Sequence, residues 1–213
     1  KELRPITLLE PCNKVCMGLL AQRLQHEAGS HLNSLPQFAY TKMRGGDDAL
    51  HRIILHCSHV RNLCDSQKYI IHSLARGAPH HAVCGGALLS LDLSKAFDNV
   101  NRSRLMACLH KLQISADLIS FLQTVYSSTT YKFEYGGETR CFDATRGIRQ
   151  GCKAAPGLWL IFTALILDEV SSRTSNTWMK DCLTMFADDI CMHQAVETPE
   201  QLHRLIRHIG VVD

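Results

Sequence analysis

Apolar residues recur along this chain with two different spacings, which predict a mixture of helices and strands. A helical spacing predicts six helices, at residues 11–24, 47–64, 101–112, 116–126, 156–170 and 199–209. Short apolar runs predict five strands, at residues 87–91, 131–135, 140–144, 182–186 and 190–193. Because these helices and strands do not alternate as βαβ units, their order predicts an α+β fold.

Three aspartates lie at the ends of predicted strands. The run from Ala87 to Leu91 is nearly continuous in apolar residues, which is typical of a strand buried on both faces, and Asp92 follows it. Asp188 and Asp189 lie between two short predicted strands. Crowded carboxylates repel one another unless a cation compensates, and Mg²⁺ prefers hard oxygen ligands. The alternative is that Asp188 and Asp189 only form a turn, where aspartate is common.

Composition places the chain among ordinary globular proteins. Its 213 residues are 46% hydrophobic and 20% charged, which excludes disordered and collagenous classes. The net charge of +3 is too small to indicate a nucleic-acid partner by itself. However, residues 1–80 carry ten basic and six acidic side chains, so the excess of basic residues lies in the N-terminal part of the chain.

The cysteine and hydropathy patterns indicate the cellular compartment in which we expect the protein. The ten cysteines include no CxxC pair, and no signal peptide precedes them, so we expect reduced thiols in an intracellular protein, nuclear or cytoplasmic. The longest apolar run, residues 154–167, is shorter than the roughly 20 residues that a bilayer span needs. We therefore predict a buried helix there and no membrane partner. The start at Lys1, without Met, suggests a fragment of a longer protein.

Three sequence motifs carry a resemblance to a known family. They are L-D-L-S-K-A-F-D at Leu91 to Asp98, G-I-R-Q-G-C-K-A-A-P at Gly147 to Pro156, and F-A-D-D at Phe186 to Asp189. In order and spacing they resemble motifs A, B and C of reverse transcriptases, and R-P-I-T-L-L at Arg4 to Leu9 resembles the fingers motif. The resemblance covers essentially the whole chain. It is strongest to the enzymes of non-long-terminal-repeat retrotransposons and weaker to those of group II introns.

The resemblance implies a right-hand polymerase fold with fingers and palm but no thumb. An antiparallel palm sheet backed by helices is expected. The implied divisions begin with the fingers at residues 1–84 and the palm with motif A at residues 85–112. A fingers return with a hairpin follows at residues 113–149, and the palm with motifs B and C and the start of motif D at residues 150–213.

The resemblance also implies a reaction and its metal ligands. Deoxynucleotides (dNTPs) would be added to the 3′-hydroxyl of a DNA primer on an RNA template. Asp92 and Asp188 match the residues that bind two Mg²⁺ ions, which Mn²⁺ could replace. Leu93 would contribute its backbone carbonyl to a metal, and Asp189 would support the site. The oligomeric state is left open.

Four further residues match positions that hold the incoming nucleotide in the family. Arg4 matches an arginine that grips the triphosphate, and Phe97 matches the bulky residue that excludes a 2′-hydroxyl. Gln150 and Gly151 match a pair that contacts the nucleotide and the templating base. Phe97 could instead be an ordinary core aromatic, and Gln150-Gly151 a plain turn.

The chain departs from the family in two places, which keeps a second function open. Lys153, Ala154 and Ala155 replace the usual proline, leucine and serine of motif B, and Ala39 replaces a glycine in the fingers. The alternative is a catalytically decayed reverse-transcriptase-like domain that binds RNA or DNA without polymerising.

Overall fold

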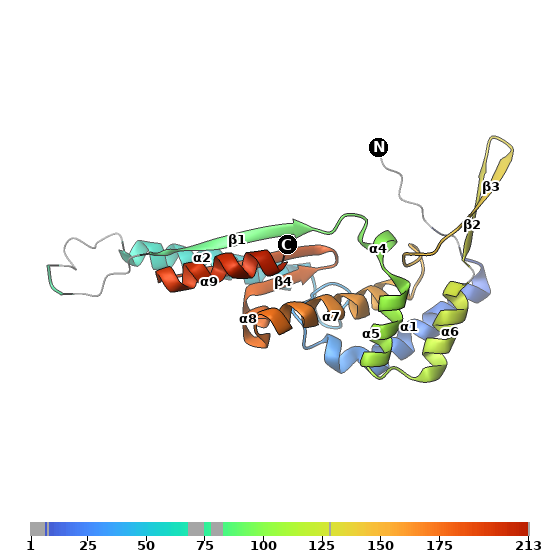
Figure 1. The fold of residues 1–213 in the computed structure, drawn as a ribbon, viewed down its shortest axis with the longest axis horizontal. Helices are drawn as coiled ribbons and strands as arrows, with labels where there is room; N and C mark the ends of the chain where they lie inside the picture. The colour runs from blue at the N-terminus through green and yellow to red at the C-terminus, as the bar shows by residue number, and fades with distance from the viewer. Residues whose placement is uncertain (1–6, 8, 68–74, 78–82, 128, 213) are drawn as a thin grey trace. The chain divides into compact units, whose positions relative to one another are not determined.

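The computed structural model describes residues 7, 9–67, 75–77, 83–127 and 129–212 (Figure 1). The chain divides into two compact units. Unit 1 contains Lys1–Ser34 and Ser94–Ile166, and unit 2 contains Leu35–Leu93 and Leu167–Asp213. Each unit therefore combines segments that are far apart in the sequence.

Unit 1 is built mainly of helices, each burying one apolar stripe. The helices α1 (Pro11–Leu32), α5 (Arg102–Lys111) and α6 (Ala116–Ser127) surround its core, and the short α4 spans Ala96–Asn99. On α1 the buried residues recur every three or four positions, at Met17, Leu20, Leu24, Ala28 and Leu32. Helices α5 and α6 pack against each other. The α1 stripe is longer than the predicted helix, which ended at residue 24.

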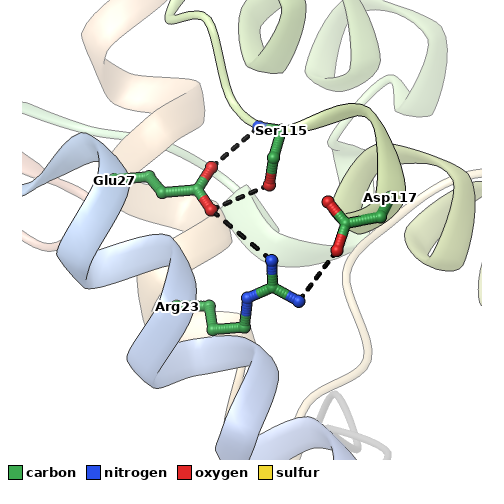
Figure 2. Close-up of polar contacts among 4 residues, drawn as sticks. All are labelled: Arg23, Glu27, Ser115 and Asp117. Carbon is green, nitrogen blue, oxygen red and sulfur yellow. Dashed lines mark hydrogen bonds and ion pairs between the residues drawn. The ribbon is translucent and has the colours of Figure 1, made fainter.

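A polar network fastens α1 to the start of α6 (Figure 2). The Glu27 carboxylate accepts hydrogen bonds from the backbone N–H and the hydroxyl of Ser115, at 2.7 and 2.8 Å. Arg23 lies 3.9 Å from Glu27 and 2.9 Å from Asp117. Hydrogen bonds from Ser115 and Arg23 lower the pKa of Asp117. The network thus satisfies polar groups at the N-terminus of α6 with a side chain from another helix.

A hairpin of β2 (Thr130–Tyr135) and β3 (Glu138–Asp143) follows α6 in unit 1. Gly136 and Gly137 form its two-residue tip with φ of 60° and 82°, the left-handed conformations that a type I′ turn needs. Two arginines hold its base. The Arg102 and Arg149 guanidiniums lie 4.8 and 5.6 Å from the centre of the Tyr126 ring. Arg102 also donates to the carbonyls of Tyr126, Ala144 and Gly147.

Unit 2 contains a three-stranded antiparallel sheet. Its order is β1–β5–β4, with β1 at Gly85–Asp92, β4 at Leu183–Phe186 and β5 at Asp189–Val196. Helix α2 (Gly46–Gln67) packs against all three strands, α8 (Asn176–Cys182) against β4 and β5, and α9 (Pro199–Val212) against β5. The predicted α+β class is confirmed, as small antiparallel sheets with helices.

The burial of β1 differs from the prediction. Its side chains alternate between half-buried and exposed, so it is not buried on both faces. The reason is that β1 is an edge strand with β5 as its one partner in the sheet, which leaves fewer side chains around it than a central strand has.

Helix α7 spans Ala155–Arg173 and carries the most apolar sequence of the chain. By length and composition it could cross a membrane, and no other helix in the described ranges meets that test. Half of its apolar window is buried inside the structure, however, and Leu158, Trp159 and Ile161 are almost fully buried. These side chains agree with the predicted buried helix.

Candidate active site

Three aspartates lie at one end of the sheet of unit 2. Asp92 is the last residue of β1 and Asp189 is the first of β5, and the strand register pairs them directly. Opposite residues of an antiparallel pair place their side chains on one face, with Cβ atoms about 5 Å apart. Asp188 precedes Asp189 in the turn between β4 and β5. We call Asp92, Asp188 and Asp189 the carboxylate edge.

The turn of the carboxylate edge has an unusual backbone. Phe186 pairs with Asp189, so Ala187 and Asp188 form a two-residue connection. Ala187 has φ +56°, a left-handed conformation that costs a residue with a Cβ atom about 1–2 kcal/mol. The buried Gln37 side chain contacts this residue twice: the Ala187 N–H donates to Gln37 Oε1, and Gln37 Nε2 donates to the Ala187 carbonyl, both at 3.1 Å.

The carboxylate edge offers the kind of ligands that a divalent cation takes. Asp92 and Asp189 are exposed, and Asp188 is half-buried. In the described part of the chain, no ion pair engages any of the three carboxylates. Nor do three His, Cys, Asp or Glu side chains among the described residues lie close enough together to hold a metal ion by themselves. Mg²⁺ commonly takes one or two carboxylates and completes its shell with water and substrate phosphates, so this open donor set fits the ion.

Tyr40 is a neighbour of the carboxylate edge that sequence reasoning missed. Burial, followed by the negative charge of Asp188, raises the pKa of the Tyr40 phenol. Its backbone φ is +58°, which is uncommon for a residue other than glycine. No periodicity or motif in the sequence links Tyr40 to Asp188, because 148 residues separate them.

In unit 1, the end of motif A is joined to the start of motif B. The N–H of Gly147 donates to the carbonyl of Val100 at 2.9 Å, and that of Ile148 donates to the carbonyl of Phe97 at 2.8 Å. Gly147 has φ +83°, and a Cβ atom there would lie 2.8 Å from the Asp98 carbonyl oxygen. Only glycine allows the two backbones to approach this closely.

The predicted nucleotide residues of motif B lie in the same junction. The Gln150 side-chain amide donates to the Asp98 carboxylate at 2.9 Å, and the Gln150 backbone carbonyl accepts from the N–H of Thr7 at 2.9 Å. Gly151 is exposed and has φ +89°. Thr7, which belongs to the segment that resembles the fingers motif, therefore contacts motif B within unit 1. Arg4 lies outside the described residues.

Phe97 is half-buried, and its ring stacks on Trp159 of α7 with 5.0 Å between the ring centres. The contact shows that Phe97 has a packing role, and its role toward a sugar stays a prediction. Leu93 directly follows Asp92 and is also half-buried. Of the substituted motif B residues, Ala154 and Ala155 are buried at the start of α7, whereas Lys153 is exposed.

Comparison with known proteins decides the family. The family model described as reverse transcriptase (RNA-dependent DNA polymerase) matches residues 1–211. The chain belongs to this family. The predicted reverse transcriptase domain is thereby confirmed.

Two relatives have matching sequences. One is the Retrovirus-related Pol polyprotein from type-1 retrotransposable element R1 of Bradysia coprophila, 27% identical over 172 residues, which are 79% of this chain and 15% of that protein. The other is the Transposon TX1 uncharacterized 149 kDa protein of Xenopus laevis, 28% identical over 112 residues, or 50% of this chain and 9% of that protein. The reverse transcriptase domain therefore spans a small part of the relatives it matches.

A solved structure shares the fold. It is the structure of telomerase from Candida albicans in complex with a TWJ fragment of telomeric RNA, with a TM-score of 0.54. The match covers 92% of this chain and 32% of that chain at 12% identity. At this identity the likeness concerns the fold alone.

Proposed function

We propose that this reverse transcriptase domain adds deoxynucleotides to the 3′-hydroxyl of a DNA primer on an RNA template, with two divalent cations held at the carboxylate edge. One observation carries the proposal: the strand register brings motif A and motif C together, with Asp92 opposite Asp189 and Asp188 beside them. Two catalytic motifs of the family, separated by about 90 residues of sequence, thus share one end of one sheet.

In this proposal Asp92 and Asp188 hold the cations, the Leu93 carbonyl is a further ligand, and Asp189 supports the charge of the site. Mg²⁺ is the expected ion, and Mn²⁺ is expected to replace it. When bound, the cations neutralise the phosphates of the nucleotide and align them for in-line displacement. The exposure of Asp92 and of the supporting Asp189 agrees with this assignment, because both carboxylates are open to solvent, while the ligand Asp188 is half-buried beside them.

The roles proposed for unit 1 concern the nucleotide. Gln150 and Gly151 would contact the incoming nucleotide and the templating base, Arg4 would grip the triphosphate, and Phe97 would exclude a 2′-hydroxyl. The backbone bond from Ile148 to Phe97 and the side-chain bond from Gln150 to Asp98 support this grouping, because they hold the two motifs together.

The finer architecture is also part of the proposal. The sheet of unit 2 would be the palm sheet, since it carries motifs A and C, and the β2–β3 hairpin would belong to the fingers return at residues 113–149. The likeness to the telomerase structure supports a right-hand polymerase arrangement. An intracellular location, nuclear or cytoplasmic, follows from the proposed substrates.

Primer extension tests the proposal. The 213-residue chain is incubated with an RNA template, a DNA primer, deoxynucleotides and Mg²⁺, and Asp92→Asn and Asp188→Asn are compared with the wild type. We expect each variant to lose extension by about 100-fold or more, since the cations supply several kcal/mol of transition-state stabilisation. Asp47→Asn is the matched control, because Asp47 is an exposed aspartate in the first turn of α2.

Two results would contradict the proposal. Extension at the wild-type rate by Asp92→Asn or Asp188→Asn would refute the metal assignment. A wild-type chain that binds the RNA–DNA duplex without extending the primer would favour the decayed binding domain instead.

A further inference from the structure

We infer that Gln37 is a positioning residue for Asp188: its buried side-chain amide fixes the Ala187-Asp188 turn and so sets the direction of the Asp188 carboxylate. The inference deepens the proposed function and rests on it for the role of Asp188 as a cation ligand. Gln37 lies in the fingers region where Ala39 replaces a glycine of the family, and the sequence motifs assign it no role. Its contacts with the turn carry the argument.

The amide of Gln37 is engaged on both sides. Its Oε1 accepts from the N–H of Ala187 at 3.1 Å and from the N–H of Ala39 at 3.0 Å, and its Nε2 donates to the Ala187 carbonyl at 3.1 Å. The residue is only 1% exposed. A buried amide with these partners cannot turn to solvent without leaving polar groups unsatisfied.

These bonds fix the peptide groups on both sides of Ala187. The N–H of Ala187 belongs to the peptide that joins it to Phe186, and its carbonyl belongs to the peptide that joins it to Asp188. Holding both groups sets φ and ψ of Ala187, and the second peptide directs the backbone into Asp188. Ala187 adopts φ +56°, a conformation that alanine does not favour, so the turn needs such support.

Gln37 is itself held in register with the neighbouring strand. The N–H of Phe38 donates to the Met185 carbonyl, and the N–H of Met185 donates to the Pro36 carbonyl, both at 2.8 Å. Gln37 thus forms a parallel bridge with Met185 on β4, two residues before the turn. The glutamine amide therefore acts from a fixed backbone position.

The test uses three variants of the full chain. Gln37→Met has a similar shape but loses all three side-chain bonds. Gln37→Glu keeps an acceptor for the N–H groups of Ala187 and Ala39. Thr41→Val is the matched control, because the buried Thr41 hydroxyl bonds only the carbonyls of Gln37 and Ala39 within its own segment.

The first measurement is hydrogen exchange at the Ala187 amide, which needs no metal or substrate. We expect slow exchange in the wild type and in Thr41→Val, at least tenfold faster exchange in Gln37→Met, and protection restored in part by Gln37→Glu. The amide of Met185 serves as an internal reference, because its bond to Pro36 does not involve the Gln37 side chain.

The second measurement is Mn²⁺ binding by electron paramagnetic resonance, with Asp188→Asn as the variant that lacks the ligand. We expect the dissociation constant to rise at least fivefold in Gln37→Met and to stay within twofold of wild type in Thr41→Val. In primer extension, the Mg²⁺ concentration for half-maximal rate should rise in Gln37→Met, while the KM for the RNA–DNA duplex stays the same.

Several outcomes would overturn the inference. Fast hydrogen exchange at the Ala187 amide in the folded wild type would overturn it. This measurement needs no variant, so it decides the question even if Gln37→Met does not fold. Wild-type Mn²⁺ affinity in a folded Gln37→Met chain also overturns it while leaving the proposed function intact. If Asp188→Asn binds Mn²⁺ like the wild type, the proposed function fails instead, and the exchange at Ala187 alone decides whether Gln37 holds the turn.

Discussion

Asp92 and Asp189 lie directly opposite each other on the neighbouring strands β1 and β5, which places two exposed carboxylates on the same face of the sheet. Like charges in this arrangement destabilise a strand pair by roughly 0.2–1 kcal/mol. We expect Asp189→Asn to raise the melting temperature in the absence of divalent cations and at low salt, and Mg²⁺ to stabilise the wild type more than the variant.

Thermal melts with and without Mg²⁺ check this expectation. Asp47→Asn is the control and should lower the melting temperature, because it removes a carboxylate that stabilises the first turn of α2. A lower melting temperature for Asp189→Asn without metal would contradict the repulsion.

Gly147 should not tolerate a side chain. Gly147→Ala places a Cβ atom 2.8 Å from the Asp98 carbonyl oxygen at a backbone φ of +83°, so the junction of motifs A and B must shift. We expect a loss of about 2 kcal/mol or more in the free energy of unfolding, measured in urea. Gly157→Ala on α7 is the matched control. A Cβ atom there meets nothing within 4 Å, and alanine favours a helix by up to about 1 kcal/mol.

The His193 side chain should make the stability of unit 2 depend on pH. Burial, then the charges of His56 and Arg52, lowers the pKa of His193 to about 4. Arg52 donates to the Thr184 hydroxyl at 3.2 Å, which lies 3.0 Å from His193 Nε2, so the hydroxyl proton can be donated to a neutral imidazole. The folded-state pKa lies below the unfolded value of about 6.5. The stabilisation is therefore complete above pH 6.5 and is lost progressively as the pH falls toward 4.

Urea unfolding between pH 7.5 and 4 measures this loss. The slope of stability against pH should be smaller in His193→Gln, which keeps an acceptor for Thr184 but does not titrate. Equal slopes in the two proteins would mean that His193 is not the group responsible.

The network in Figure 2 should contribute more to the free energy of unfolding than an exposed ion pair does. Glu27→Gln removes the charge that receives two hydrogen bonds from Ser115, and we expect a cost of about 1–2 kcal/mol. Glu169→Gln on α7 breaks an exposed pair with Arg173 and should cost less than about 0.5 kcal/mol. Equal costs in urea unfolding would show that the Ser115 bonds add nothing.

One substitution separates the packing role of Phe97 from the role toward the sugar that we propose for it. Phe97→Val removes the stack on Trp159, which should cost about 1 kcal/mol in stability. If Phe97 also excludes a 2′-hydroxyl, the variant will incorporate ribonucleotides more readily in primer extension. A loss of stability with unchanged sugar preference would leave packing as its one role.

Much of the fold was predictable because its signals are local. The type and order of the predicted helices and strands follow from apolar spacing, and the motifs place Asp92, Asp188 and Asp189 at strand ends. The short helices α4 and α8 were missed, since four and seven residues are too few to show a helical period. The burial of β1 was misjudged because an apolar run does not reveal whether its strand lies at an edge.

The contacts that shape the candidate site were not predictable in the same way. Gln37 and Ala187 are 150 residues apart, and no sequence pattern around a loop glutamine predicts which residue it hydrogen-bonds. The close approach of Gly147 to Asp98 likewise depends on how two loops pack. Such pairings are properties of the folded backbone, and a single sequence leaves no periodic trace of them.

The stem of the β2–β3 hairpin is hydrogen-bonded to the rest of unit 1, whereas its tip is exposed. Through one guanidinium, Arg102 binds the carbonyl of Ala144 at the end of the stem and that of Gly147 at the start of motif B. Gly136 and Gly137 at the tip are exposed, and a Cβ atom on either would touch nothing. Insertions, tags or fluorescent labels should therefore be tolerated at the tip, whereas altering the stem by even one residue would disturb the loop that begins motif B.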